Sequence, residues 1–398
     1  MQQNPILFVE INETNFIFVA FRYDNNQNLK IIDKLIVNND VLHKNKLISI
    51  NEATNLIKKN IENLENKVNH VFKKVTIVLD TFDSLCISIS GNKKLNGSQL
   101  LKENISYILN SIKSSITDNM LKKSVLHIFN SKSTLDGTST ENLPIGLFGD
   151  FYNHELTFFL IDNNDLKNIK QIFNKNDLEV EKIILKQFCE GTYLIKKHKV
   201  ESFYKIKFGK NSSYINFFEK ESFRFSEKFD FGTDMILKDI LRICSIEKES
   251  LISILSNKIF NKNVFEKNEF IEEKYFGKNS FRKIKKQLIK DIVDARVEEI
   301  SNIIFNKNIN LKTFDKKNLH IYITIEDQLV SDNFKESFKN FLSNNINTIP
   351  NFEDIQDTYN SIINYANISV YGWKKEAIPI TQTKNSLITR IFKSLFGS

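Results

Sequence analysis

Hydrophobic positions along the chain change repeatedly between two spacings, one typical of strands and one typical of helices. An alternating pattern over residues 6–24 and 29–37 predicts a β-hairpin or meander. A helical spacing follows over 51–74, and the short apolar run at 75–80 predicts a buried strand. Further along, the pattern predicts helices over 100–115 and 164–176, and strands over 123–129 and 155–162.

The second half of the chain begins with strands again, over 201–232. It is then strongly helical, and the longest predicted helix spans 281–305. A strand is predicted at 320–325, and a last helix begins near Asn364. Strand clusters followed by helices thus occur twice, with no linker between the halves. This order indicates an α/β protein with two related lobes.

The composition indicates a folded protein, because 41% of the 398 residues are hydrophobic and 12% are aromatic. No apolar run is long enough to predict a transmembrane helix. The N-terminus lacks a basic region and a small-residue cleavage site, so we expect no signal peptide. Three widely spaced cysteines predict reduced thiols in a cytoplasmic protein, and neither a disulfide framework nor a metal site is expected.

The formal net charge of +8 comes from lysines that are spread among 48 acidic residues. This distribution favours an ordinary solvated surface. No stripe of basic and aromatic residues runs along the chain, so nucleic-acid binding is not expected. The charge is compatible with an anionic membrane surface.

The last 14 residues, "NSLITRIFKSLFGS" (385–398), separate into an apolar and a polar half when placed on a helix. Such a helix is about 21 Å long and too short to span a bilayer core of about 30 Å. It suits the membrane interface, with its cations toward the headgroups. The predicted membrane-binding residues are Leu387, Ile388, Arg390, Ile391, Phe392, Lys393, Leu395 and Phe396. The alternative is a helix packed on the protein's own core, against which the polar segment 374–384 argues.

The order of elements resembles the actin/Hsp70/sugar-kinase superfamily, and four segments are similar to the bacterial cell division protein FtsA. The first, "LHIFNSKSTLDGTSTENLPIGLFGD" (126–150), has a histidine in a strand, then Asp-Gly, then Pro-Ile-Gly and a further glycine. The second is "DARVEEISNIIF" (294–305), and the third is "NYANISVYG" (364–372). The amphipathic tail is the fourth.

The resemblance implies a two-lobed actin-like (ribonuclease H-like) ATPase fold with an FtsA-type, SHS2-like inserted sub-domain and a C-terminal amphipathic helix. The implied boundaries are 1–85 and 164–199 for the first lobe, with 352–373 returning to it; 86–163 for the inserted sub-domain; 200–237 and 313–351 for the second-lobe core; 238–312 for its helical sub-domain; 374–384 for a linker; and 385–398 for the membrane-targeting helix.

The superfamily holds ATP with two glycine-rich turns and an adenosine loop, and all three are altered in this chain. The first turn reads "EINET" (10–14), with Asn12 in place of a glycine. The second reads "KFGKNSS" (207–213), with Lys207 in place of an acidic residue. The adenosine loop aligns with "ITIE" (323–326), which has no glycine. Close phosphate approach favours residues without a Cβ, and the chain has 11 glycines against about 28 for average usage.

A degenerate nucleotide site is therefore expected. Its candidate residues are Thr14, Gly209, Ser212, Ser213, Gly232 and Glu299. ATP binding stays open, because Lys207 and Lys210 are able to attract phosphate without magnesium. We expect no ATP turnover, and we assign no catalytic residue and no metal site.

The family resemblance also implies partners. The helical sub-domain would receive the C-terminal tail of the tubulin homologue FtsZ, near the basic residues Arg282, Lys283, Lys285 and Lys286. The inserted sub-domain would mediate a head-to-tail polymer of the chain with itself and contacts to other divisome proteins. The expected location is peripheral, on the cytoplasmic face of the inner membrane at the division septum.

Two other functions stay open. One is a pilus-assembly actin-like scaffold, which binds a peptide of an inner-membrane protein and lacks the amphipathic tail. The other is an active ATPase or sugar kinase of the same superfamily, which needs an acidic residue where this chain has Lys207. Packing of the tail on the core would favour the first, and magnesium-dependent ATP turnover would favour the second.

Overall fold

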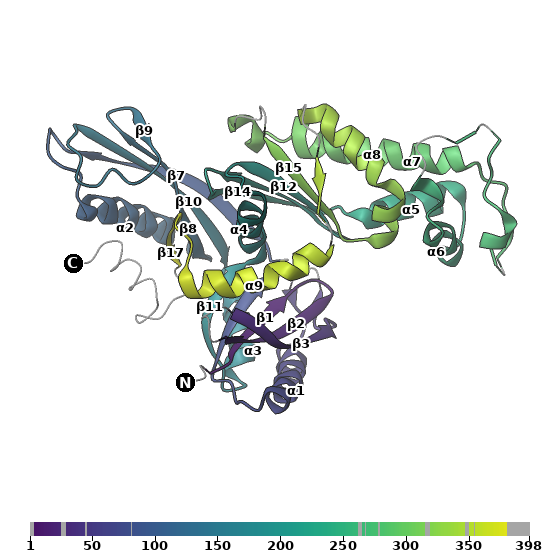
Figure 1. Ribbon diagram of the computed structural model, residues 1–398, viewed down its shortest axis with the longest axis horizontal. Coiled ribbons are helices and arrows are strands. Elements are labelled where there is room, and N and C mark those ends of the chain that lie inside the picture. Colours follow the sequence, from purple (N-terminus) through teal and green to yellow (C-terminus); the bar gives the residue numbers. More distant parts are fainter. Residues whose placement is uncertain are drawn as a thin grey trace. The chain divides into compact units, whose positions relative to one another are not determined.

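The computed structural model describes residues 4–24, 29–43, 46–80, 82–261, 265–266, 268–277, 279–314, 319–346, 350–353 and 355–379. The chain divides into two compact units (Figure 1). Unit 1 comprises residues 1–201, 218–226 and 358–398, and unit 2 comprises residues 202–217 and 227–357. Each unit is described separately below.

Unit 1 contains a main sheet whose strands have the order β11-β6-β1-β2-β3. Its strands are β1 (Ile6–Ile11), β2 (Asn15–Tyr23), β3 (Leu29–Asn38), β6 (Lys74–Leu79) and β11 (Glu179–Leu185). β1 is parallel to β6 and antiparallel to β2, and β11 is parallel to β6. The predicted meander over 6–37 is therefore confirmed. A separate two-stranded sheet is formed by β4 (Leu42–His43) and β5 (Lys46–Leu47).

The helices of unit 1 form where the sequence has helical hydrophobic spacing. Apart from α2, which is described below, they are α1 (Ile50–Val68), α3 (Asn163–Asn174), α4 (Lys186–His198) and α9 (Ile355–Tyr371). The first three residues of α9 belong to unit 2. In α1 the Ser49 side chain caps the first turn by accepting from the Glu52 N–H, and Ile57, Ile61 and Leu64 are buried on one side.

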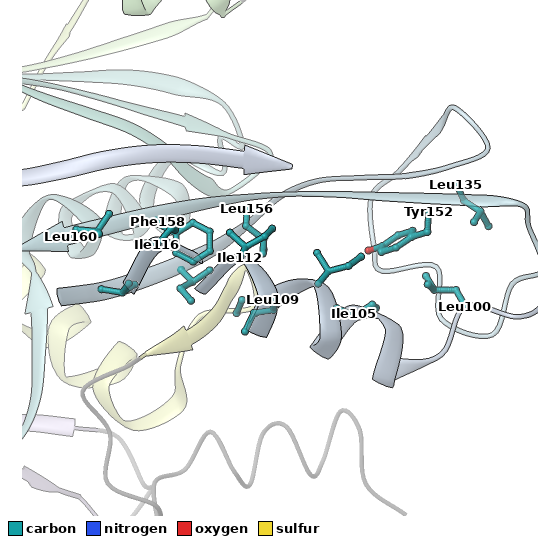
Figure 2. Packing of buried hydrophobic residues seen from close by; sticks show 14 of the residues in the cluster. Leu100, Ile105, Leu109, Ile112, Ile116, Leu135, Tyr152, Leu156, Phe158 and Leu160 are labelled. Carbon is teal, nitrogen blue, oxygen red and sulfur yellow. The ribbon is translucent and has the colours of Figure 1, made fainter. Parts of the chain in front are cut away.

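A second sheet of unit 1 belongs to the inserted segment and has the order β17-β8-β10-β7, with β9 paired to β8. The strands are β7 (Ser84–Lys94), β8 (Lys123–Leu135), β9 (Thr138–Thr140), β10 (Phe151–Asp162) and β17 (Glu376–Pro379). Helix α2 (Lys102–Asn119) lies along one face of this sheet. Figure 2 shows Ile105, Ile112 and Ile116 of α2 facing side chains of β10. This apolar layer is the core of the inserted sub-domain.

The last described strand, β17, is distant in sequence from the inserted segment but forms the edge strand of its sheet. It pairs antiparallel with β8. The Leu185 N–H donates to Nε2 of the buried His127 at 3.1 Å, so the ring proton lies on Nδ1, which donates to Glu376 Oε1 at 2.6 Å. Residues 376–379 of the predicted linker therefore form a strand that is anchored by a buried polar pair.

Unit 2 contains one sheet with the order β14-β13-β12-β15-β16. Its strands are β12 (Phe203–Phe208), β13 (Ser213–Glu219), β14 (Ser222–Phe229), β15 (His320–Ile325) and β16 (Asn351–Phe352). Residues 218–219 of β13 and 222–226 of β14 are counted with unit 1. β15 is parallel to both β12 and β16. If the strands of each sheet are numbered in chain order, this sheet and the main sheet of unit 1 both read 3-2-1-4-5. The prediction of two related lobes is confirmed by this repeated order.

The rest of unit 2 is mostly helical, as predicted. Its elements are α5 (Thr233–Cys244), α6 (Lys248–Ser256), η1 (Ile259–Asn261), η2 (Glu273–Tyr275), α7 (Lys286–Ser301), the π-helical η3 (Asn302–Asn306), η4 (Asn310–Thr313) and α8 (Gln328–Ile346). The predicted helix over 281–305 was wrong at its start, since the helix begins only at Lys286 and Lys285 is extended. The backbone there pairs with 269–271, and Ile271 N–H donates to the Ile284 carbonyl at 2.9 Å.

No helix among the described residues is long and apolar enough to cross a membrane. All three cysteines are free thiols.

His154 of β10 is a polar residue inside the core of the inserted sub-domain. Its side chain is fully buried, and neither ring nitrogen has a hydrogen-bond partner within the described part of the chain. It lies opposite Gly91 of β7, where an added Cβ would approach Ile108 of α2 to 2.4 Å. Burial lowers the pKa of His154 to about 4.

This burial predicts a pH-dependent stability. Between the ordinary pKa of 6.5 and the folded value of about 4, only the unfolded chain binds a proton at His154. The free energy of unfolding should therefore decrease as the pH decreases, and His154 should contribute a loss of about 2 kcal/mol on going from pH 7 to pH 5. Urea unfolding at both pH values will measure it. His154→Phe should reduce the pH dependence by that amount, whereas His198→Phe, at an exposed position of α4, should not. Equal pH dependence in wild type and His154→Phe would contradict the assignment.

Candidate functional site

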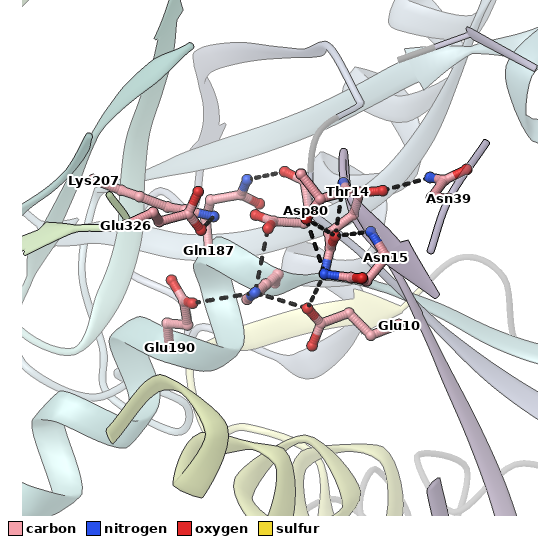
Figure 3. A network of polar contacts seen from close by, with 11 residues as sticks. Glu10, Thr14, Asn15, Asn39, Asp80, Gln187, Glu190, Lys207 and Glu326 are labelled. Atoms are coloured by element: carbon pink, nitrogen blue, oxygen red, sulfur yellow. Dashed lines mark hydrogen bonds and ion pairs between the residues drawn. The ribbon is translucent and has the colours of Figure 1, made fainter. Parts of the chain in front are cut away.

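The first candidate turn joins β1 to β2, and the side chain of Asn12 is hydrogen-bonded within it. Its neighbours Thr14, Asn15 and Asn39 are labelled in Figure 3. Asn12 Oδ1 accepts hydrogen bonds from the backbone N–H groups of Thr14 and Asn15, at 3.0 and 2.7 Å. The Thr14 hydroxyl donates to the same oxygen at 3.3 Å. One side-chain oxygen therefore collects three donors within its own turn.

Neighbouring residues hold Asn12 in this position. Asn39 Nδ2 donates to the Asn12 carbonyl at 2.6 Å, and Asn39 N–H donates to the Thr14 carbonyl at 2.8 Å. Asn12 Nδ2 in turn donates to Glu10 Oε1 at 3.2 Å. Any other acceptor would have to displace the Asn12 side chain to reach the amides of this turn.

A buried ion cluster adjoins the turn through Glu10. Lys186 Nζ at the start of α4 lies 2.7 Å from Glu10 Oε1, 3.2 Å from Asp80 Oδ2 and 3.9 Å from Glu190 Oε1. Glu10 is in β1 and Asp80 directly follows β6, so the parallel pairing of these strands brings both carboxylates to the same edge of the sheet. All four side chains are at most 9% exposed.

The electrostatics of this cluster keep Lys186 charged. Burial alone lowers the pKa of its ammonium, but the carboxylates of Asp80 and Glu10 outweigh burial and raise that pKa well above its ordinary value. The next side chain, Gln187, donates to the Asp80 carbonyl. Lys186 therefore acts as a permanent counter-charge for buried carboxylates.

The second candidate turn, between β12 and β13, is closed by its own backbone. Gly209 N–H donates to the Ser212 carbonyl at 2.9 Å. The N–H groups of Thr233 and Asp234 at the start of α5 donate to the carbonyls of Gly209 and Lys210, both at 3.0 Å. Amides at a helix N-terminus are the donors that usually hold a phosphate. Here both already have acceptors.

The other predicted residues of this turn also make contacts that hold the turn closed. A Cβ at Gly232 would lie 2.3 Å from the Gly209 carbonyl oxygen, so only glycine permits the two backbones to approach this closely. The Ser213 hydroxyl donates to the Phe231 carbonyl at 2.7 Å. Gly209, Ser212, Ser213 and Gly232 thus lie together in and beside this turn, where their contacts are with other groups of the chain.

Lys207 and Glu326 form an ion pair across two parallel strands of unit 2. Lys207 is in β12, Glu326 follows β15, and their Nζ and Oε1 atoms lie 2.8 Å apart (Figure 3). Lys207 is 4% exposed, whereas Glu326 is 43% exposed. These are the positions where the family pattern has an acidic residue and a glycine. The ammonium of Lys207 is therefore paired within the chain.

Glu299, expected beside adenosine, is exposed on α7 and forms an ion pair with Arg296. Arg296 Nε also donates to Asp239 of α5 at 2.6 Å. The Glu299 carboxylate thus takes part in an exposed network between two helices of unit 2.

The residues of the two turns do not fit the phosphates and metal ion that the resemblance implies. The N–H groups of Thr14, Asn15, Gly209, Thr233 and Asp234 all have acceptors within the chain. No group of three or more His, Cys, Asp or Glu residues in the described ranges is arranged to hold a metal ion. We therefore derive no chemical step through ATP or magnesium.

Sequence reasoning identified Asn12 but missed the residues that surround the first turn. Asp80 was recognisable as the polar end of the predicted strand 75–80, a position that often carries functional side chains in parallel sheets. Lys186, by contrast, is one of 56 Lys and Arg residues, and nothing in its local sequence marks it. Asn39 and Glu190 likewise become visible only when the fold places them beside Asn12 and Lys186.

Comparison with known proteins gives a structural likeness only, since the chain matches no protein-family model and no curated protein by sequence. The solved PilM–PilN type IV pilus biogenesis complex is similar with a TM-score of 0.53, 8% identity and 89% coverage of each chain. MreB5 of Spiroplasma citri bound to ADP has a TM-score of 0.49, 11% identity, and coverage of 100% of this chain and 99% of that one. EutJ of Carboxydothermus hydrogenoformans has a TM-score of 0.48, 9% identity, and coverage of 92% and 90%.

The likeness to the PilM–PilN structure covers 89% of this chain, with a TM-score above 0.5. The protein has the actin-like ATPase fold. At this level of identity the likeness establishes the fold alone.

The four basic residues predicted to bind a peptide differ in their contacts. Lys283 Nζ lies 4.6 Å from the centre of the Phe270 ring, and Lys286 forms a 3.0 Å ion pair with Glu269. Arg282 and Lys285 are exposed in the extended segment before α7. The four residues are thus neighbours in sequence, but only Lys286 lies in a helix, whereas the predicted helix over 281–305 included all four. All the predicted membrane-binding residues, 387–396, lie outside the described residues.

Filling of the first turn by Asn12 predicts a cost for removing its side chain. Asn12→Ala leaves the amides of Thr14 and Asn15 without their acceptor, so the free energy of unfolding should fall by about 1–3 kcal/mol. Chemical denaturation will measure this. Asn60→Ala is the control, because that side chain only donates to the Leu56 carbonyl within α1, and its stability should change by less than about 0.5 kcal/mol. Similar stability of both variants would contradict a structural role for Asn12.

Proposed function

We propose that this chain is an actin-like scaffold that works without ATP turnover, and that it tethers FtsZ filaments to the cytoplasmic face of the inner membrane, as FtsA does. In this role it helps to assemble the divisome at the septum. The observation that carries the scaffold function is that the amides of both phosphate-type turns are occupied by acceptors of the chain itself. A partner-binding role needs the fold but no nucleotide chemistry.

The FtsA-like part of the proposal is supported by the four sequence segments and by the position of the inserted sub-domain. The insertion comes directly after β6 and contains β7, α2, β8, β9 and β10. Six of its large hydrophobic side chains are about half exposed or more: Leu101, Tyr107, Leu121, Leu147, Phe148 and Phe151. Exposed apolar side chains suit a surface for contacts with another protein. We propose self-association and divisome partners there.

The FtsZ tail would bind the helical sub-domain at the segment before α7. Arg282 and Lys285 are exposed there, and the nearby Phe281 and Leu288 are 45% and 42% exposed. A peptide with both acidic and apolar residues matches this combination of charge and apolar area.

Membrane binding is assigned to residues 385–398 on their sequence pattern. One such helix, with Arg390 and Lys393 as its cations, is a weak and reversible anchor. Many helices on one FtsZ filament would bind more strongly through multivalency.

A second candidate is a pilus-assembly-type scaffold that binds a peptide of an inner-membrane protein. The TM-score of 0.53 to the PilM–PilN complex favours it. It differs from the first proposal in its partner and in needing no amphipathic tail.

The tether proposal predicts co-sedimentation of FtsZ filaments with anionic vesicles in the presence of the full-length chain. A truncation after Lys384 should lose this recruitment, because it removes the amphipathic residues. Addition of ATP should leave the result unchanged. Recruitment that needs ATP would overturn the nucleotide-independent scaffold. Binding of the chain to vesicles without FtsZ would keep the membrane anchor and reject the partner, and absence from the vesicles would favour the pilus-type scaffold.

The peptide site predicts a local effect of charge reversal. Replacing Arg282 and Lys285 by Glu should weaken binding of an FtsZ C-terminal peptide by at least about fivefold, because two favourable charge contacts become repulsive. Fluorescence anisotropy with a labelled peptide will measure the affinity. Replacing Lys58 and Lys59 by Glu, at exposed positions of α1 in unit 1, makes the same charge change and should leave the affinity unaltered. Equal weakening by both pairs would reject this site.

A further inference from the structure

Strand β7 of the inserted sub-domain has one edge that no other described strand covers. It is an end strand of its sheet, and among the described strands only β10 pairs with it. This pairing continues from residue 84 to residue 94 without a bulge, so the open edge is long and regular. Natural edge strands are usually short, bulged or covered, because an open edge is able to pair with another chain.

The pairing with β10 determines which residues of β7 face the open edge. Leu95 N–H donates to the Asp150 carbonyl at 2.7 Å, in the same register that places Lys94 opposite Phe151. In an antiparallel pair, hydrogen-bonded and non-hydrogen-bonded residue pairs alternate. The backbone groups of the even-numbered residues of β7 therefore point away from β10. The exposed residues among them are Ser88, Ser90, Asn92 and Lys94.

The second half of β7 is the accessible part of this edge. The Cys86 thiol donates to the Arg224 carbonyl at 3.5 Å, so β14 lies beside the first half. Among the described residues, no backbone group outside β10 bonds to residues 88–94. These seven residues span about 23 Å at 3.3 Å per residue, which is enough for a partner strand of ordinary length.

Two lysines and two aromatic rings flank the accessible half, with one of each on either face of the sheet. Lys93 lies on the face of α2, with its ammonium 4.8 Å from the centre of the Tyr107 ring. Lys94 lies on the opposite face, 5.8 Å from the centre of the Phe151 ring. Neither ammonium has a carboxylate partner in the part of the chain that the structure describes. Both rings are more than half exposed.

We propose that the edge of residues 88–94 binds an extended acidic segment of a partner protein by strand addition. The backbone of the segment pairs with the outward N–H and carbonyl groups of β7. Successive side chains of a strand point to opposite faces. Two adjacent acidic residues opposite Lys93 and Lys94 therefore place one carboxylate on each face, where each meets one lysine. Neighbouring apolar side chains of the segment cover the rings of Tyr107 and Phe151.

The charge of β7 favours this occupant over a second copy of the chain. Residues 84–94, "SLCISISGNKK", contain two lysines and no acidic residue. Pairing of two β7 edges would leave all four ammonium groups without carboxylates, and lysine on an edge strand usually protects against such self-pairing. An acidic segment supplies the missing charges. The inference rests on the proposed role of the inserted sub-domain in partner binding, and it specifies the chemistry of the partner.

The experiment is selection of peptides from a displayed random library on the full-length chain, followed by fluorescence anisotropy with a selected peptide. We expect selected peptides to carry two adjacent acidic residues beside apolar ones. A version with the two acidic residues separated by one position should bind at least about fivefold more weakly, because both carboxylates then point to the same face and only one reaches a lysine.

Variants of β7 test the backbone pairing and the charges separately. Ser90→Pro removes an N–H group that points to the open edge, where proline is tolerated, and it should weaken peptide binding by at least about tenfold. Ser90→Ala keeps this N–H group and should leave the affinity unchanged. Lys93→Glu/Lys94→Glu should lose the acidic peptide and bind a version with lysines at the two acidic positions. If Ser90→Pro does not fold, this charge exchange decides the test.

Three results would overturn the inference: no enrichment of acidic peptides, binding that folded Ser90→Pro leaves unchanged, and binding that survives the charge reversal. A wild-type dimer that becomes monomeric in Ser90→Pro would assign the edge to a second copy instead. The assay contains neither FtsZ nor vesicles. Peptide binding together with failure of FtsZ recruitment would therefore reject the tether and keep this site, and recruitment without peptide binding would do the reverse.

Discussion

Buried carboxylates need a positive partner, and the first lobe depends on the one that Lys186 supplies. Its ammonium joins the end of β1, the residue after β6 and the start of α4, three elements that are far apart in the sequence. Without it, charges that are at most 9% exposed would face one another. The Asn12 turn is attached to this cluster through Glu10. The edge of the main sheet is therefore organised around one side chain.

Unit 2 solves the corresponding problem with other residues. The ion pair of Lys207 and Glu326 joins β12 to the end of β15. The backbone N–H groups at the start of α5 donate to carbonyls of the turn after β12. In both units, groups that the family pattern turns toward a ligand are turned toward other groups of the chain.

The architecture was largely predictable from the sequence, because periodicity and element order reflect burial directly. The prediction failed where backbone hydrogen bonding to another segment overrides periodicity. Ile284 fits a helical spacing, yet the backbone of 284–286 pairs with 269–271 and the helix begins only at Lys286. For the candidate site, the sequence predicted only that the expected glycines and acidic residue of the nucleotide-binding turns are absent. Asn12 and Lys207 were recognised as departures from a pattern, but their replacements for the lost contacts, Asn12 Oδ1 and Glu326, depend on side-chain geometry that spacing does not encode.

The pairing of β17 with β8 has a consequence for the order of folding during synthesis. Residues 202–217 and 227–357 of unit 2 are complete when unit 1 still lacks its final segment. The buried His127 lacks Glu376, and the inserted core lacks Ala377, until residues 376 and 377 have emerged from the ribosome. The unit that is begun first is therefore finished last. A nascent chain that is stalled before residue 376 would present an unpaired edge of β8 to the chaperones at the exit tunnel.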